Sequence, residues 1–417
     1  MGFAPIHRSR PTGFDLRPAS MPEAIEVVPR IWVSEGFSNT FCLPTDAGRL
    51  VVNTGMFFEV PVHQRNFDAV DRRPIHTIVL TQGHVDHVGG VDHLREPDTV
   101  VIAHEHNAAH QADDERISRY RMDKSAFAFG ESVMDGIRAV IDEFGALPAQ
   151  TVPVPDVTFG DRYDLTLGDR RIELHHVPGG ETNDSLVVWL PDEKVALVGN
   201  FFSALIGHIP NLVTMRGDRL RDPLAFVASV DRILALQPEV VLPGHHGAVE
   251  GAELIHEELT RIRDATQFVH DRTVAGMNEG KSVWDLMEEI ALPPELEVGE
   301  GYGKVSWDVR AIWELYTGWF KHESTTELYG SPRRSVDGHL VELAGGVGPV
   351  AARAEELVGD DDPVGAIHLA EVALSVDPRH AVARAAMLAA HRRLRADESN
   401  FWLASWLDRQ IAELTSD

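Results

Sequence analysis

Cysteine is almost absent from this chain. Its 417 residues include one cysteine, Cys42, so no disulfide can form within the chain. Cys42 lies in the run Thr40-Phe41-Cys42-Leu43, which is typical of a strand, where a lone cysteine is usually a small buried hydrophobic residue. The sequence also lacks an apolar run long enough to cross a membrane and the basic-then-apolar pattern of a secretory signal. These absences predict a cytoplasmic protein with no membrane partner.

Positive charge is also scarce. Lysine and arginine number 38 against 65 aspartates and glutamates, which gives a formal net charge of −27. A surface this acidic repels phosphate backbones and anionic lipid, so we expect no nucleic-acid partner. An anionic substrate would need locally placed cations, because the field of the whole chain opposes it.

Hydrophobic residues make up 43% of the chain, enough for a sizeable core, and their pattern changes once along the sequence. The first part alternates short strand-like runs with helices. The runs lie at 31–33, 40–43, 50–52, 77–80, 99–103, 165–167, 171–175, 186–190, 195–198 and 240–242. From about Ala252 the periodicity is helical almost to the end. We therefore predict two domains, 1–262 and 263–417.

The second part contains two helical segments, 363–376 and 380–394, separated by Asp377-Pro378. Small residues recur in them at helical spacing, which allows helices to approach closely. These residues are Ala366, Ala370, Ala373, Ala381, Ala383 and Ala385. The pattern resembles a tetratricopeptide-type hairpin and predicts helical packing, not a repeat array.

Four motifs rich in possible metal ligands stand at predicted strand ends or in the loops that follow them. They are 82–87 (QGHVDH), 178–182 (PGGET), 199–200 (GN) and 243–247 (PGHHG). Histidine and carboxylate bind Zn²⁺ and related first-row metals, and the adjacent glycines let the backbone approach closely. One such motif alone would indicate only polar residues on the surface near a turn, but several together predict a metal site.

The spacing within 82–87 is informative. His84 and Asp86 are two residues apart in an extended loop, so they can point the same way, while His87 points to the other side. One short loop can therefore supply ligands to two neighbouring metal positions. A second set, His104, His106 and His110, has possible ligand spacing but no loop-and-glycine context, so an ordinary strand-to-helix transition is the favoured interpretation.

The order of these motifs resembles the metallo-β-lactamase superfamily and, within it, the alkylsulfatase family, which hydrolyses alkyl sulfate esters. The resemblance includes a glutamate after Pro-Gly, here Glu181, and the segment Asn211 to Gly217 (NLVTMRG). Downstream, 268–271, 302–303, 318–320 and 343–346 resemble the family's dimerisation domain. The resemblance implies an α/β fold, an αββα sandwich followed by an all-helical dimerisation domain, and a homodimer.

The resemblance also implies two metal positions, and this sequence departs from both patterns. The first position would use His84 and Glu181, but Gln82 stands where the family has its first histidine. The second position would keep Asp86, His87 and His245. The family's second acidic ligand, expected between the two metals, aligns with Asn200. Amide oxygens are weak ligands for zinc, so we predict one firmly bound Zn²⁺ or other first-row divalent ion in preference to two.

The function that follows is hydrolysis of a sulfate ester or similar ester of a small molecule. Asp86 would hold the metal and orient water, Asn211 and Arg216 would bind the charged part of the ester, and Phe127 and Phe129 would line its organic part. Hydrolysis of a lactone, thioester or amide is the first alternative. A non-catalytic metal or ligand binder is the second, favoured by Gln82 and Asn200. If those amides mark only the loss of a metal, restoring histidine and glutamate there should recover a second metal position.

Overall fold

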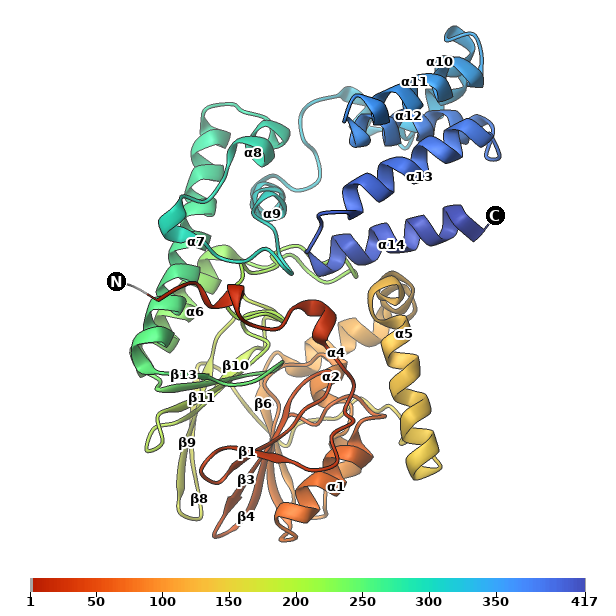
Figure 1. Ribbon diagram of the computed structural model, residues 1–417. Helices are drawn as coiled ribbons and strands as arrows, with labels where there is room; N and C mark the ends of the chain where they lie inside the picture. The colour runs from red at the N-terminus through yellow and green to blue at the C-terminus, as the bar shows by residue number, and fades with distance from the viewer. Residues whose placement is uncertain (1–2, 417) are drawn as a thin grey trace. The chain divides into compact units, whose positions relative to one another are not determined.

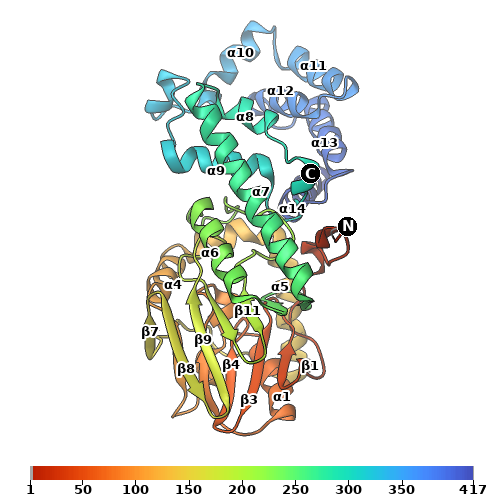
Figure 2. The same cartoon turned by 90° about the vertical axis from the view of Figure 1, so that its left-hand side faces the viewer.

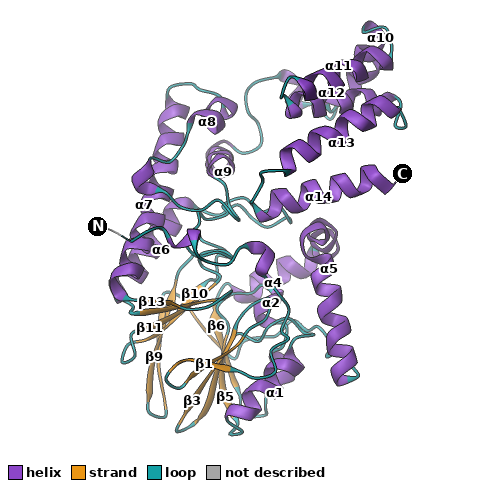
Figure 3. Ribbon diagram, in the orientation of Figure 1, coloured by secondary structure: helices purple, strands orange, loops and turns teal. Residues whose placement is uncertain are grey.

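The computed structural model describes residues 3–416. The chain forms two compact units, Met1–Leu315 and Tyr316–Asp417. Strands are confined to the first unit within the described residues (Figure 3).

One sheet of the first unit has seven strands in chain order. These are β1 (Ile25–Val28), β2 (Ile31–Ser34), β3 (Thr40–Thr45), β4 (Gly48–Val52), β5 (Ile75–Val79), β6 (Val100–His104) and β7 (Val157–Phe159). The strands from β1 to β4 pair antiparallel, and β4, β5, β6 and β7 pair parallel. The parallel strands are joined through helices, as such connections require.

The second sheet has six strands in the order β13-β12-β11-β10-β9-β8. They are β8 (Arg162–Leu167), β9 (Arg170–His176), β10 (Leu186–Leu190), β11 (Val195–Gly199), β12 (Val240–Pro243) and β13 (Val249–Glu250). Only β11 and β12 pair parallel among these strands. Buried residues of both sheets share one core, including Leu50, Ile102, Leu174 and Val188, so the sheets pack face to face.

Helices cover both outer faces of this sandwich. On the side of the β1–β7 sheet lie α1 (Val60–Val70), α2 (Val85–Val88), α3 (Val91–Leu94), α4 (Asn107–Arg116) and α5 (Ser118–Phe144). On the other side, α6 (Pro223–Leu236) and α7 (Ala252–Asn278) cover the β8–β13 sheet (Figures 1 and 2). Asp222 caps α6 by accepting from the Leu224 and Ala225 N–H groups. The αββα sandwich predicted from the sequence is confirmed.

The first unit also contains α8 (Val283–Glu289) and most of α9 (Val305–Thr317), which pack on α7 through Leu286, Val309 and Ile312. The predicted domain boundary after Ile262 falls inside α7, whereas the compact units divide after Leu315. A functional division of the chain at 262/263 therefore stays a prediction.

The second unit is helical. It contains α10 (Asp337–Leu343), α11 (Val347–Gly359), α12 (Pro363–Val376), α13 (Ala381–Arg395) and α14 (Phe401–Ser416). Short 3₁₀ turns lie at Thr325–Leu328 and Arg333–Val336 in this unit, and at Ile6–Arg8, Gly13–Asp15 and Pro294–Leu296 in the first unit. The predicted helical segments 363–376 and 380–394 correspond to α12 and α13.

Small side chains make the core of the second unit. Ala366, Ala370 and Ala373 of α12 are fully buried, as is Ala383 of α13. Ala381 and Ala385 are exposed, because the buried face of α13 continues at the helical spacing of Ala383, Ala386 and Ala390. Between residues 3 and 416, no helix has the length and apolar character needed to cross a membrane.

Candidate metal centre

The loops that follow β5, β9, β11 and β12 carry the predicted ligands, and they contact one another. The Gly244 N–H donates to the Gly199 carbonyl at 2.7 Å, and the Leu186 N–H donates to the Thr81 carbonyl at 2.9 Å. A Cβ added at Gly180 would lie 1.9 Å from the Phe201 carbonyl oxygen, so only glycine fits there. The four motifs, far apart in sequence, therefore meet in one place.

The loop before β3 holds the predicted second metal position in place. That position consists of Asp86, His87 and His245. Ser38 Oγ lies 3.1 Å from His87 Nδ1 and donates to the Gly244 carbonyl. Asn39 Nδ2 donates to the His246 carbonyl at 2.8 Å, which fixes the loop that presents His245. Asp86 Oδ2 lies 3.4 Å from His87 Nε2.

The protonation states of this group suit metal binding. Burial lowers the pKa of His245 to about 3 and also lowers the pKa of His87, so both imidazoles are neutral at neutral pH. Burial alone would raise the pKa of Asp86, but His87, His84 and His245 lower it below its ordinary value. A carboxylate and two neutral imidazoles result.

Asn200 lies against the same loop. A Cβ added at Gly244 would come within 2.1 Å of Asn200 Oδ1, so the glycine allows this close approach. Asn200 is buried, and its Oδ1 has no hydrogen-bond partner. A buried amide oxygen without a partner is costly, which makes it an available acceptor beside His245.

The residues of the predicted first metal position lie together in a group of their own. They are Gln82, His84 and Glu181. Gln82 Nε2 lies 3.0 Å from His84 Nδ1, and that nitrogen lies 3.4 Å from Glu181 Oε1. Arg216 Nη2 donates to Glu181 Oε1 at 3.1 Å and lies 3.5 Å from both ring nitrogens of His84. All three predicted residues are buried and close together.

Sequence reasoning missed the ion pairs around this second group. His84 Nε2 donates to Asp218 Oδ2 at 3.0 Å, and Arg121 Nη2 lies 3.3 Å from the same oxygen. Arg221 is 6% exposed and lies 2.9 Å from Glu181 Oε1. Asp218 directly follows the Asn211–Gly217 segment, and this adjacency was the one sequence signal for these ion pairs. Arg121 lies on α5, far from that segment in the sequence.

Two backbone hydrogen bonds hold Asn211 next to this cluster. It is buried, its carbonyl accepts from Arg221 Nη1, and its N–H donates to Ser203 Oγ at 3.4 Å. Its side-chain Oδ1 has no hydrogen-bond partner. Of the predicted apolar lining, Phe127 and Phe129 are half-buried on α5, and Phe129 makes an edge contact with Phe37 at a centroid distance of 6.5 Å.

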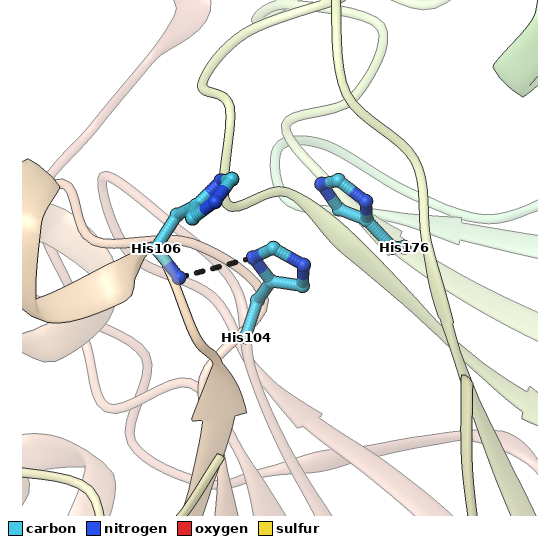
Figure 4. Close-up of side chains that lie close together, drawn as sticks. All are labelled: His104, His106 and His176. Carbon is cyan, nitrogen blue, oxygen red and sulfur yellow. Dashed lines mark hydrogen bonds between the residues drawn. The ribbon is translucent and has the colours of Figure 1, made fainter. Parts of the chain in front are cut away.

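The histidines His104, His106 and His110 do not form one group in the structure. His110 of α4 turns to the centre, where its ring lies 4.9 Å from that of His84, and one ligand atom each of His84, His110 and Asp218 lie within 4.8 Å of one another. His104 and His106 join His176 at the end of β9 instead (Figure 4).

The His104–His106–His176 cluster is packed as neutral rings. The rings of His104 and His176 are stacked with centroids 3.7 Å apart and planes 14° apart (Figure 4). His104 Nδ1 accepts from the His106 N–H at 3.2 Å, its ring also hydrogen-bonds the Gly160 backbone, and burial lowers its pKa to about 4. Imidazole binds metal through a lone pair in the ring plane, so parallel stacked rings do not aim at one ion. The stacked rings therefore form a packing contact, in line with the favoured interpretation of this segment.

Comparisons with known proteins define the family. Residues 33–245 match the family described as Metallo-beta-lactamase superfamily, and residues 283–416 match Alkyl sulfatase dimerisation. The chain is 30% identical over 366 residues to a linear primary-alkylsulfatase of Pseudomonas sp. (strain ATCC 19151), a match that covers 84% of this chain and 68% of that relative. The chain belongs to the alkylsulfatase family of the metallo-β-lactamase superfamily.

Other members of the family are more distant. An (R)-specific secondary-alkylsulfatase of Pseudomonas sp. is 24% identical over 400 residues, which cover 90% of this chain and 60% of that relative. The solved structure of a stereoselective inverting sec-alkylsulfatase from Pseudomonas sp. has a TM-score of 0.81 at 21% identity, covers 94% of this chain and 66% of that chain, and shows the shared fold. The chain thus spans about two thirds or less of the length of these relatives. The family resemblance and fold class predicted from the sequence are confirmed.

Proposed function

We propose that this protein is a metal-dependent hydrolase of a sulfate ester or related ester, with one divalent ion held by Asp86, His87 and His245. The observation that carries this proposal is the combination of that ligand group with a neighbouring group in which two guanidinium groups, the largely shielded Arg216 and the buried Arg221, pair with Glu181. The relatives named as alkylsulfatases support the substrate class.

The second position fits a metal ion on its own chemistry. His245 Nδ1 is buried without a hydrogen-bond partner, so the neutral ring has a lone pair available. With the Asp86 carboxylate and His87, it makes a set of three protein ligands that leaves a position open for water or substrate. Imidazole and carboxylate suit zinc and its first-row neighbours, and Zn²⁺ is the proposed ion.

An ion there supplies Lewis acidity and lowers the pKa of water toward neutrality. The residues of the chain supply the rest. Asp86 is ionised and oriented beside His87, so it holds its ligand geometry and accepts a hydrogen bond from water. Arg216 presents a planar fork that matches the oxygens of a sulfate group, and the unpartnered Asn211 Oδ1 is available to a polar group of the substrate.

Local charge explains how an acidic chain takes an anion. The net charge of −27 repels anions at long range, but Arg216 and Arg221 are largely shielded from solvent, where their charge is screened less. Phe127 and Phe129 of α5 offer an apolar surface to the organic part of the ester.

The substrate class is tested by turnover with and without metal. The purified protein is expected to release inorganic sulfate from a linear alkyl sulfate, to lose this activity with a chelator and to regain it with Zn²⁺. A chromogenic carboxylate ester, a lactone and a thioester are assayed in parallel. Faster hydrolysis of one of those would reject the sulfate ester, and metal binding without any turnover would indicate a ligand-binding protein.

The proposed assembly is a homodimer formed through the helical second unit. This unit exposes large apolar side chains, with Leu343 85%, Tyr329 69% and Trp319 67% exposed, and such side chains favour burial in an interface. Light scattering at micromolar concentration should give twice the 46.1 kDa mass of one chain. Leu343→Glu should weaken the dimer and Val152→Glu, on the first unit, should not. A parent protein that is monomeric under these conditions would refute the proposal.

A further inference from the structure

We propose that Glu59 is a positioning residue of the metal centre, which fixes from outside the ligand set the two loops that hold His87 and His245. The inference rests on the proposed function for the identity of these metal ligands. It assigns a role to a buried carboxylate that lies outside the four ligand motifs and outside the ion pairs around Glu181.

Glu59 stands at the start of α1, and its side chain is shut off from solvent. It is the residue before the helix, yet its carboxylate does not cap that helix, and its exposed fraction is 0%. Burial of a carboxylate is costly, and it raises the pKa of Glu59 to about 7. Backbone N–H groups that hydrogen-bond the carboxylate offset part of this cost.

These hydrogen bonds join three segments that are far apart in the sequence. Glu59 Oε1 accepts from the Ala19 N–H and the Phe37 N–H, each at 2.8 Å, and Oε2 accepts from the Met56 N–H at 2.9 Å. The segment at Phe37 can come this close because a glycine precedes it: a Cβ added at Gly36 would lie 2.7 Å from Glu59 Oε1. One carboxylate therefore fixes the positions of all three segments.

The segment 37–39 contacts both imidazole ligands. Next to the anchored Phe37, the fully buried Ser38 places its Oγ 3.1 Å from His87 Nδ1. Asn39 Nδ2 donates to backbone carbonyls on both sides of His245 in the sequence, at 3.0 and 2.8 Å. The His245 ring also hydrogen-bonds the Phe37 backbone. A shift of this segment would therefore move both imidazoles.

The segment 54–56 holds the backbone of His87. Thr54 lies two residues before the anchored Met56, and its N–H and its Oγ1 both donate to the His87 carbonyl at 2.9 Å. Glu59 thus acts on the ring of His87 through Phe37 and on its backbone through Met56.

Groups that orient metal ligands in this way control how tightly a metal is held. Their loss typically costs about 10- to 100-fold in metal affinity or activity. Because Glu59 acts on two of the three proposed ligands, its loss should weaken zinc binding and alter the geometry of the centre. A carboxylate that served only the stability of the fold would change neither.

The inference is tested by zinc binding to variants of the full chain. Glu59→Gln keeps the size of the side chain but turns one acceptor oxygen into a donor, so at least one backbone N–H loses its acceptor; Glu59→Ala removes both oxygens. The matched control is Glu258→Gln. Glu258 is also a buried glutamate that accepts from a backbone N–H, but its partners, Ile6 and Arg261, lie outside the segments 37–39 and 54–56.

Two measurements are made on each protein. The zinc dissociation constant is obtained by competition with a chromogenic chelator, and the visible absorption spectrum of the cobalt-substituted protein reports the geometry of the ligands. The dissociation constant is expected to rise about 10-fold in Glu59→Gln and about 100-fold in Glu59→Ala, with a changed cobalt spectrum, and to keep the parent's value in Glu258→Gln.

A parent-like zinc affinity and cobalt spectrum in Glu59→Gln would overturn the inference. An equal loss of affinity in Glu258→Gln would also overturn it, because the effect would then belong to the stability of the fold. If Glu59→Ala does not fold by circular dichroism, Glu59→Gln decides alone. A parent that binds no zinc would reject both this inference and the proposed function. An inactive parent with the expected changes in affinity would reject the proposed hydrolysis and keep this inference.

Discussion

Replacing Asp86 with alanine is expected to lower kcat/KM by about 1000-fold or more and to abolish firm metal binding. Asp86 is the one carboxylate of the Asp86, His87 and His245 group, and its Oδ2 lies 3.4 Å from Nε2 of the neutral His87 imidazole. Its loss removes a negative charge that a divalent ion needs and the Lewis acidity that the ion supplies. Effects of this size are usual when one preorganised electrostatic group is removed from an active site.

The control for this variant is Asp92→Ala, an exposed aspartate on the next short helix, α3. Zinc per chain and the rate of sulfate release are measured for both variants. The metal-centred mechanism would be rejected if Asp86→Ala lost metal and kept its turnover. An Asp86→Ala variant that keeps both would show that another group holds the ion.

Replacing Arg216 with lysine is expected to lower kcat/KM for an alkyl sulfate by about 100-fold, which corresponds to roughly 2.7 kcal/mol of transition-state stabilisation. Lysine keeps the positive charge but cannot donate two parallel hydrogen bonds to one sulfate group. The ion pair with Glu181 would also weaken, because the planar group that reaches both Glu181 and His84 is lost.

Arg219→Lys is the matched control, since Arg219 lies three residues away and its side chain is 84% exposed. Steady-state kinetics with a panel of alkyl sulfates separate the effects on KM and kcat. Unchanged kinetics in Arg216→Lys would remove Arg216 from the site. An equal loss in Arg219→Lys would indicate an effect of overall charge and no specific contact.

The fold and the ligand loops were predictable from the sequence for a local reason. The strand-like runs before 82–87, 178–182, 199–200 and 243–247 are buried strands, and each ligand loop follows its strand directly. The strands β9, β11 and β12 run in the same direction, so their loops lie at one edge of the second sheet, and the loop after β5 of the first sheet contacts that edge through the hydrogen bond from the Leu186 N–H to the Thr81 carbonyl. The resemblance to the alkylsulfatase family then predicted how these ligands divide between two metal positions.

The ion pairs around Glu181 were not predictable in this way. Arg121 comes from the long helix α5, and Asp218 and Arg221 come from the loop before α6, with no strand to fix their register. Charged side chains on helices and loops are usually solvated, so nothing in the sequence marks these residues as buried. Burial within the tertiary fold overrides that expectation: Arg221 is buried, and the side chains of Arg121 and Arg216 are largely shielded from solvent.

The most direct test of the single-ion centre is anomalous diffraction at the zinc edge from crystals of the metal-loaded parent protein. A single strong peak is predicted among Asp86, His87 and His245, with the Arg216 guanidinium still beside Glu181 and His84. A second peak of similar height between His84 and Glu181 would contradict the single-ion centre.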